Sequence, residues 1–289
     1  DQVDAILHSS LSGQAGARAV LNALVGLVNQ SGKLSESYPF RYEETPAFNF
    51  FPGKEATAEY REGLFVGYRY YDTAKVPVRF PFGFGLSYTT FAYANLVWSE
   101  EEVIFDLTNT GKTPGAEVAQ LYIGAKRSRV YRPAKELKGF AKVFLKAGET
   151  QKVTIKLDQD AFKFFNPDTN RWETEELDYE ISVGASSQDI RLTGIIHVAG
   201  NKPVALIKRE ILPSYAEGDI QGVSQSEFEI LLGRKVPSPT YAFYRKNRLV
   251  VGYNTTVEQL RYAKGWTGRL FSGTIRFANR FLHAIGQHK

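Results

Sequence analysis

Residues 102–111, EVIFDLTNTG, decide the fold class of this chain. Val103, Phe105 and Leu107 are separated by single residues that include Asp106, so apolar and polar side chains fall on opposite sides of an extended backbone. The Asn-Thr-Gly that closes the stretch is a turn signal. This period of two is typical of a strand in an antiparallel sheet that has one buried face.

The same pattern continues from about residue 91 to residue 199. It recurs in EVAQLYIG (117–124), TQKVTIKLD (150–158), DYEISVGAS (178–186) and DIRLTGIIHVAG (189–200). Turn signals such as KAGE (146–149) and NPDTN (166–170) separate these stretches. About seven short strands in roughly 110 residues indicate an antiparallel β-sandwich of the immunoglobulin or fibronectin type III kind.

The residues before this region have a different character. Residues 14–28 favour a helix with Ser12 as N-cap, and KLSESYPF (33–40) favours a short strand that ends at Pro39. The helix carries one apolar face, made of Val20, Leu21, Leu24, Val25 and Val28. A lone helix and strand cannot bury such faces, so residues 1–90 are interpreted as the end of a larger α/β layer structure with an ordered, aromatic-rich connecting segment.

One stretch of that connecting segment, YREGLFVGYRYYD (60–72), has aromatic side chains at both odd and even positions. Read as a strand, it would place aromatic residues on both faces, which predicts contacts on two sides. Burial of Glu62 and Arg69 would be tolerable if they formed an ion pair. The stretch is therefore interpreted as a seam between two domains.

The C-terminal residues 201–289 favour helices. Ser224 with Glu227 and Thr255 with Glu258 fit the capping-box pattern. Three apolar helix faces follow: Phe228, Leu231 and Leu232; Val257, Leu260, Ala263 and Trp266; and Ile275, Ala278, Phe281, Leu282 and Ile285. Residues 202–289 contain 14 Lys and Arg against 6 Asp and Glu, a net charge of +8, which suits an acidic neighbouring domain or an anionic membrane surface. No nucleic-acid-binding motif accompanies this charge.

Composition excludes several classes of function. The 289 residues include no cysteine, so disulfides, thiolate catalysis and Cys-zinc sites are absent. The start, DQVDAILHSS, lacks the features of a signal peptide, and no apolar run is long enough to span a membrane, so a cytoplasmic location is expected. The absence of methionine indicates a fragment, a processed product, or a sequence from which modified methionines are missing.

No catalytic, cofactor-binding or metal-binding residue is predicted. His8, His197, His283 and His288 form no pair at metal-binding spacing. The glycines of FGFGLSY precede a strand rather than a helix, which favours a tight turn over a phosphate site. The acidic groups Glu43 and Glu44, Glu100 to Glu102, and Glu173, Glu175 and Glu176 favour solvated surface over a pair of glycosidase carboxylates.

Several stretches resemble the C-terminal region of family-3 glycoside hydrolases of the bacterial β-glucosidase kind. GQAGARAVLNALVGLVNQSGKLSESYP (13–39) resembles a family signature, with Gln30 where proline is usual and Ala15 where glutamate is common. YREGLFVGYRYYD and RFPFGFGLSYTTFAY (79–93) resemble the lead into the family's fibronectin type III-like domain. That domain is matched by TNTGKTPGAEVAQLYIG (108–124), RPAKELKGFAKVFLKAGETQKVTIKLD (132–158) and YEISVGASSQDIRLTG (179–194), and LPSYAEGDIQGVSQSEFEILLGRKVP (212–237) resembles a bacterial extension.

The resemblance implies three parts: residues 1–90 as the end of the α/β sandwich domain with its connection, residues 91–200 as the fibronectin-like domain, and residues 201–289 as a basic helical extension. The fold class is mainly β. Members of the family carry a nucleophilic aspartate on a (β/α)8 barrel and an acid/base glutamate on an α/β-sandwich loop, and neither segment has a match here. The resemblance therefore implies a retaining hydrolase of terminal β-linked sugars as the parent enzyme, and an inactive, structural role for this chain alone.

The expected partner is the missing catalytic barrel, placed before or after this segment. The β-glucoside substrate is expected only through the parent enzyme, and no cofactor or nucleic acid is expected. Sugar specificity and homo-oligomerisation stay open. One alternative is a stand-alone carbohydrate-binding or adhesion module that uses Trp98, Trp172 or Trp266, although burial is expected for each. Another is a membrane-surface protein that acts through its basic tail.

Overall fold

The computed structural model describes residues 3–53, 58–167, 169–200, 210–236, 260 and 265–284, with side chains described as far as residue 282. The chain forms two compact units. One contains residues 1–49 and 61–228, and the other contains residues 50–60 and 229–289.

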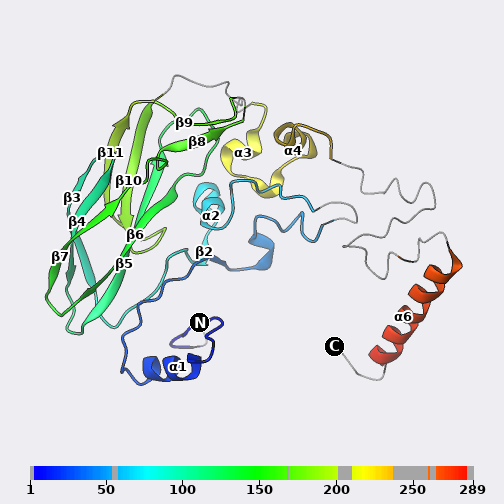
Figure 1. The fold of residues 1–289 in the computed structure, drawn as a ribbon, viewed down its shortest axis with the longest axis horizontal. Coiled ribbons are helices and arrows are strands. Elements are labelled where there is room, and N and C mark those ends of the chain that lie inside the picture. The colour runs from blue at the N-terminus through cyan, green and yellow to red at the C-terminus, as the bar shows by residue number, and fades with distance from the viewer. Residues whose placement is uncertain are drawn as a thin grey trace. The chain divides into compact units, whose positions relative to one another are not determined.

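Seven strands of the first unit form a β-sandwich, as the sequence predicts (Figure 1). The three-stranded sheet has the order β3-β4-β7, and the four-stranded sheet has the order β11-β10-β5-β6, all antiparallel. The strands are β3 (Phe91–Trp98), β4 (Glu102–Asn109), β5 (Gly115–Ala125), β6 (Glu136–Leu145), β7 (Thr150–Lys156), β10 (Leu177–Gly184) and β11 (Ile190–Val198). This arrangement is that of a fibronectin type III-like domain.

The core of the sandwich lies between the two sheets. Val103, Phe105 and Leu107 on β4 are fully buried, which confirms the alternation seen in the sequence. They pack with apolar residues of the facing sheet, among them Leu121, Ile123, Tyr179, Ile181 and Val183. The sandwich therefore has a closed core of its own.

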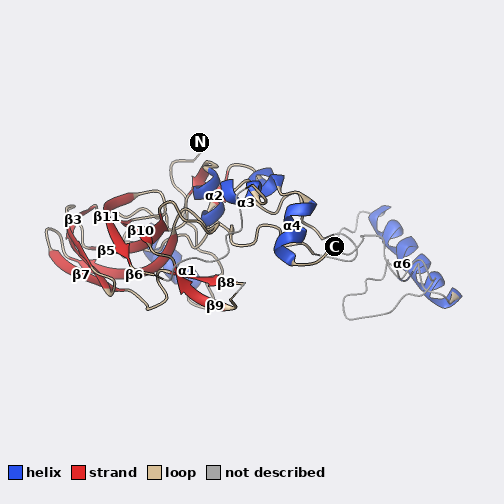
Figure 2. Ribbon diagram, turned by 90° about the horizontal axis from the view of Figure 1, so that it is seen from above, coloured by secondary structure: helices blue, strands red, loops and turns tan. Residues whose placement is uncertain are grey.

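Two small two-stranded sheets and several helices complete the described chain (Figure 2). One sheet pairs β1 (Tyr38–Pro39) with the distant β2 (Val78–Phe80), and the other is a hairpin of β8 (Lys163–Asn166) and β9 (Arg171–Thr174). The helices are α1 (Gly16–Leu24), η1 (Tyr42–Glu44), α2 (Tyr68–Ala74), α3 (Pro213–Glu217), η2 (Ile220–Gly222), α4 (Gln225–Leu232) and α6 (Trp266–Ala284).

The helix near the N-terminus is shorter than the predicted span 14–28. It begins after Ala15 because the backbone at Gly13 has a φ of +63°, and it ends before Gly26, which has a φ of +74°. Ser12 is not the N-cap; its hydroxyl donates a hydrogen bond to the carbonyl of Ser9, at 3.0 Å. The strand predicted from 33–40 is also reduced, to Tyr38–Pro39, and it ends at Pro39 as the sequence predicts.

The period-two interpretation of residues 60–72 is wrong. Residues 61–64 form a turn and residues 68–74 form helix α2. Gly63 and Gly67 have φ values of +51° and +58°, which interrupt a regular extended backbone. The predicted Glu62–Arg69 ion pair is not formed. Arg69 lies 3.9 Å from Glu136 instead.

In the C-terminal part, the first predicted capping box is confirmed. The Ser224 hydroxyl accepts a hydrogen bond from the Glu227 N–H, and the Glu227 carboxylate accepts one from the Ser224 N–H. Helix α4 ends at Gly233, which has a φ of +67°. The second capping box, Thr255 with Glu258, lies outside the described residues, as do most of the apolar positions expected between 257 and 263.

Candidate functional site

The most extensively bonded feature of the first unit is the contact between residues 61–90 and the four-stranded sheet. Helix α2 lies beside strand β6. The Tyr68 hydroxyl oxygen accepts a hydrogen bond from the Leu137 N–H at 2.7 Å, and its ring meets the ring of Tyr122 edge-on. Asp72, with a buried side chain, forms an ion pair of 3.2 Å with Lys135. We call residues 61–90 the connecting segment.

A buried glutamine ties the connecting segment to two strands. The Gln120 side-chain nitrogen donates hydrogen bonds to the carbonyls of Gly83, at 3.1 Å, and Ala185, at 2.8 Å. Its side-chain oxygen accepts a hydrogen bond from the Tyr122 hydroxyl at 2.6 Å. Gly83 has a φ of +79°, and a Cβ atom there would overlap the Gln120 amide, so only glycine fits this approach. FGFGLSY is thus a tight turn, as the sequence favours.

A second buried contact lies further along the same sheet. Lys33 and Glu117 form an ion pair of 2.8 Å with side chains only 13% and 9% exposed, and the Lys33 ammonium also donates a hydrogen bond to the Gly85 carbonyl at 3.0 Å. Nearby, the Asn29 amide donates to the Pro114 carbonyl at 3.0 Å. Asn29 and Lys33, which precede the connecting segment in the chain, are therefore fixed to strand β5 and the loop before it.

The opposite side of the connecting segment contacts the helical extension. The Arg61 guanidinium donates a hydrogen bond to the Val223 carbonyl at 3.1 Å and lies over the ring of Phe228 at 5.3 Å. The Tyr215 hydroxyl donates to the Arg61 carbonyl at 2.7 Å. The seam predicted from the aromatic residues therefore exists, but its two neighbours are the fibronectin-like sheet and the 212–228 helices.

The helical extension is itself fixed by Glu227. This buried carboxylate accepts hydrogen bonds from the N–H and hydroxyl groups of both Ser214 and Ser224. Burial alone would raise the pKa of Glu227, but these hydrogen bonds outweigh it and lower the pKa below its usual value.

Helix α1 carries an apolar face that the described chain leaves open. Leu21 and Leu24 on the helix, and Val25, Leu27 and Val28 just after it, are each more than half exposed. Exposed apolar patches of this kind are typical of surfaces that bind another layer or partner. The exposure agrees with the expectation that a lone helix and strand cannot bury the apolar faces of this region.

The other candidates from the sequence do not converge on one site. His197 pairs with Asp178 at 2.9 Å, and His8 contacts Ser10 at the same distance. Glu44, Glu173 and Glu175 accept hydrogen bonds from their own local turns or from the neighbouring 128–129 segment. Among the described residues, no cluster of three His, Cys, Asp or Glu side chains is suited to a metal ion.

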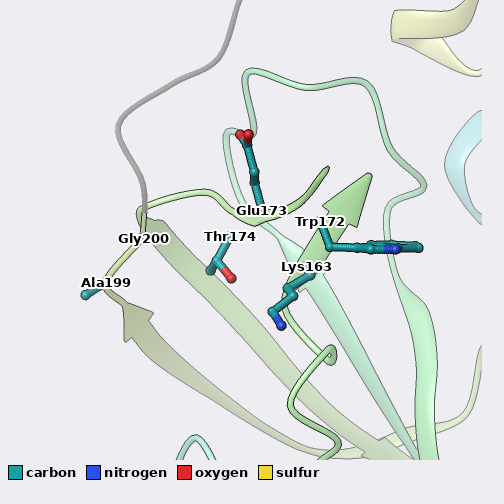
Figure 3. Close-up of a pocket in the computed structure, with 6 residues that line it drawn as sticks. All are labelled: Lys163, Trp172, Glu173, Thr174, Ala199 and Gly200. Atoms are coloured by element: carbon teal, nitrogen blue, oxygen red, sulfur yellow. The ribbon is translucent and has the colours of Figure 1, made fainter. Parts of the chain in front are cut away.

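The three tryptophans differ from the expectation of burial. Trp98 is partly covered: its ring lies against Gly194 and its N–H donates to the Ile195 carbonyl at 3.2 Å. Trp172 and Trp266 are 61% and 73% exposed. Trp172 lines a shallow depression of about 370 Å³ together with Lys163, Glu173, Thr174, Ala199 and Gly200 (Figure 3).

Two family models match the chain. The "Glycosyl hydrolase family 3 C-terminal domain" matches residues 1–88, and the "Fibronectin type III-like domain" matches residues 117–187. The chain belongs to the family-3 glycoside hydrolases and is the non-catalytic C-terminal part of their β-glucosidase-like members.

Three similar proteins support this assignment. Thermostable beta-glucosidase B of Acetivibrio thermocellus is 43% identical over 225 residues, which are 75% of this chain and 30% of that protein. An exo-alpha-(1->6)-L-arabinopyranosidase of Bifidobacterium breve is also 43% identical, over 201 residues that are 27% of its length. The crystal structure of a Bifidobacterium adolescentis GH3 beta-glucosidase matches 91% of this chain and 33% of its own, with a TM-score of 0.65 and 32% identity.

These matches show which part of its relatives the chain corresponds to. It spans less than a third of the length of either curated relative, so the catalytic domain lies elsewhere. Sequence reasoning found the family and the strands, but it missed Gln120, Lys33 and Glu117 as the residues that join the segments. Nothing in their local sequence signals that role.

Proposed function

We propose that this chain braces the catalytic part of a retaining β-glucosidase-like enzyme. Its fibronectin-like sandwich holds the connecting segment in one position, and the open face of helix α1 packs on the remainder of the α/β sandwich domain. The observation that carries this proposal is the buried polar contact at Gln120, where one side chain links the connecting segment to strands β5 and β10. Such a contact fixes geometry because each bond depends on a specific position.

The chemistry of glycoside cleavage explains why a brace is useful. A retaining glycosidase needs its two carboxyl groups about 5 Å apart, and in this family they are expected on two different domains. A small displacement of one domain would change that distance. A rigid C-terminal part that holds the α/β sandwich domain would therefore support the rate of hydrolysis without touching the sugar.

The test is a chimera. The chain alone is expected to show no hydrolysis of an aryl-β-glucoside. When it replaces the matching 225 residues of the Acetivibrio thermocellus β-glucosidase B, hydrolysis is expected to be retained, and Leu24→Asp in the same chimera is expected to reduce it strongly. A matched control is Val97→Asp, because Val97 is also largely exposed but lies on strand β3, outside helix α1 and the connecting segment.

Two outcomes would contradict the proposal. Turnover by the isolated chain would place catalytic groups within it. An unaffected rate in the Leu24→Asp chimera would show that the open face of α1 is not a docking surface for the catalytic part.

A second candidate function rests on helix α6. At about 100° per residue, its large exposed apolar side chains fall within roughly 160° of the helix circumference, and its three arginines fall within roughly 40° on the other side. The apolar set is Trp266, Leu270, Phe271, Phe277, Phe281 and Leu282, and the helix contains no Asp or Glu. Such a helix fits the surface of an anionic membrane, with its aromatic face in the headgroup region. Among the described helices, none has the length and apolar character needed to cross a bilayer.

Vesicle sedimentation separates this candidate from the first. The chain is expected to bind vesicles of phosphatidylcholine with 30% phosphatidylserine at low salt, and to be released by high salt or by Phe277→Asp. Asn279→Asp on the same helix is the charge-matched control, because Asn279 is exposed and lies outside the arc of the apolar side chains. If the wild-type chain leaves such vesicles unbound, the membrane function is refuted.

A further inference from the structure

The hairpin formed by β8 and β9 has one face fastened to the sandwich. On that face Phe164 lies under the Arg132 guanidinium at 5.3 Å, and the fully buried Asn166 donates a hydrogen bond to the Glu173 carboxylate at 3.1 Å. The Thr169 hydroxyl donates a second hydrogen bond to the same carboxylate. The two hydrogen bonds lower the pKa of Glu173, chiefly through the bond from Thr169, and they link the two strands and the turn of the hairpin.

The other face of the hairpin points to solvent. Phe165 is paired with Trp172 across the two strands, and Lys163 is paired with Thr174, so these four side chains share one face. Trp172 is 61% exposed and Phe165 is 46% exposed, and their rings meet edge-on with centroids 5.7 Å apart. Figure 3 shows the indole projecting outward from the strand, while Glu173 points in another direction.

The polar groups beside this indole are free to bind a ligand. Within the described residues, the Trp172 N–H and the Thr174 hydroxyl have no hydrogen-bond partner. Lys163 uses one of its three N–H donors on Asp160, at 2.7 Å, which also neutralises its charge. The depression of about 370 Å³ beside these groups is shallow and open to solvent, so it can receive one face of a small ligand.

The side chains on this surface favour one chemical class of ligand. An exposed aromatic ring offers a flat apolar face, and its neighbours offer donors and acceptors at the rim. The charges are balanced, because Lys163 is paired with Asp160, which disfavours a strongly anionic ligand such as a nucleic acid. A pyranose ring with equatorial hydroxyls has the complementary form: a flat face of C–H groups and a rim of hydroxyls.

We propose that the Trp172 face of the β8–β9 hairpin is a saccharide-binding site for neutral pyranosides such as β-linked gluco-oligosaccharides. Trp172 stacks on one sugar ring, Phe165 supports the indole from its edge, and Lys163 and Thr174 bind hydroxyls of that ring or its neighbour. The site is independent of the proposed brace, because it uses none of the residues of the connecting segment.

The experiment is a titration of the full 289-residue chain with cellobiose and cellotetraose, followed by the NMR signals of the three indole N–H groups. We expect saturable shifts of the Trp172 signal with a Kd on the order of 1 mM, as befits a small ligand on a single aromatic platform. Mannitol, which has hydroxyls but no ring face, is expected to produce no shift.

Variants of Trp172 and a control variant test whether binding depends on this indole. Trp172→Ala is expected to weaken cellotetraose binding at least about tenfold, whereas Trp172→Phe keeps part of it. Trp266→Ala is the matched control, because Trp266 is even more exposed yet lies on helix α6, and it is expected to leave binding unchanged. Thermal unfolding of Trp172→Ala is expected to match the wild type because the side chain is mostly exposed.

Three results would overturn the proposal. They are the absence of a shift of the Trp172 signal at 20-fold the expected Kd, wild-type affinity in a folded Trp172→Ala variant, and equal shifts with mannitol.

Discussion

The Gln120→Leu substitution tests how strongly the Gln120 side chain holds the connecting segment against the sandwich. Leucine has nearly the volume of glutamine but provides no hydrogen bonds, so the carbonyls of Gly83 and Ala185 and the hydroxyl of Tyr122 would each lose a partner. The Tyr122 hydroxyl belongs to a fully buried residue, and leaving it unpaired costs about 1–3 kcal/mol. The two carbonyls add about 1 kcal/mol each, so a loss of roughly 3–5 kcal/mol in unfolding free energy is expected.

The assay is urea unfolding followed by circular dichroism, with hydrogen exchange of the Leu137 amide as a local readout, because Tyr68 accepts a bond from that amide. The control is Gln151→Leu, the same change at an exposed position of strand β7, where an effect within about 0.5 kcal/mol is expected. If Gln120→Leu destabilises by less than about 1 kcal/mol, or no more than Gln151→Leu does, the connecting segment is not held by this side chain.

Three further substitutions test other contacts. Glu227→Gln is expected to lower the melting temperature at neutral pH and to make it depend less on pH in the acid range. The folded pKa of Glu227 lies below 4.5, so the wild type alone should lose this stability as the pH falls through and below 4.5. Thermal melts from pH 7 to pH 3 will measure both effects. Lys33→Met is expected to cost about 3 kcal/mol by leaving the Glu117 carboxylate buried without its cation, and adding Glu117→Gln should recover most of it in a double-mutant cycle. Burial raises the pKa of Tyr71 to about 12, so the folded state favours the neutral phenol. The resulting stability is complete below pH 10 and is lost as the pH rises towards 12. The melting temperature of Tyr71→Phe should therefore fall less than that of the wild type between pH 10 and pH 12.

The sandwich was predictable because its signal is local. Each strand shows its buried face through alternation within eight or nine residues, and turn residues mark the ends. The capping box of Ser224 and Glu227 was predictable for the same reason, since its two members are three residues apart. The family motifs added the order of the parts.

The connecting segment was not predictable from local pattern. Its aromatic residues contact a sheet on one side and helices on the other, and this arrangement suits a turn followed by a short helix as well as it suits a strand. Gln120 and Tyr122 occupy the outward side of strand β5, where alternation predicts solvent. They are buried because a distant segment covers them, and only the tertiary structure contains that information.

The contacts of the connecting segment can form only after their distant partner residues have been synthesised. Tyr68 leaves the ribosome 69 residues before Leu137, and Phe82 is synthesised still longer before Ser187, whose N–H donates a hydrogen bond to the Phe82 carbonyl. At about 5–20 residues per second, the aromatic segment spends several seconds or more without its binding surface. Docking of the segment therefore follows completion of strand β10, so a nascent chain stopped before residue 185 should keep the segment open to proteases and chaperones, and one stopped after the last sandwich strand should not.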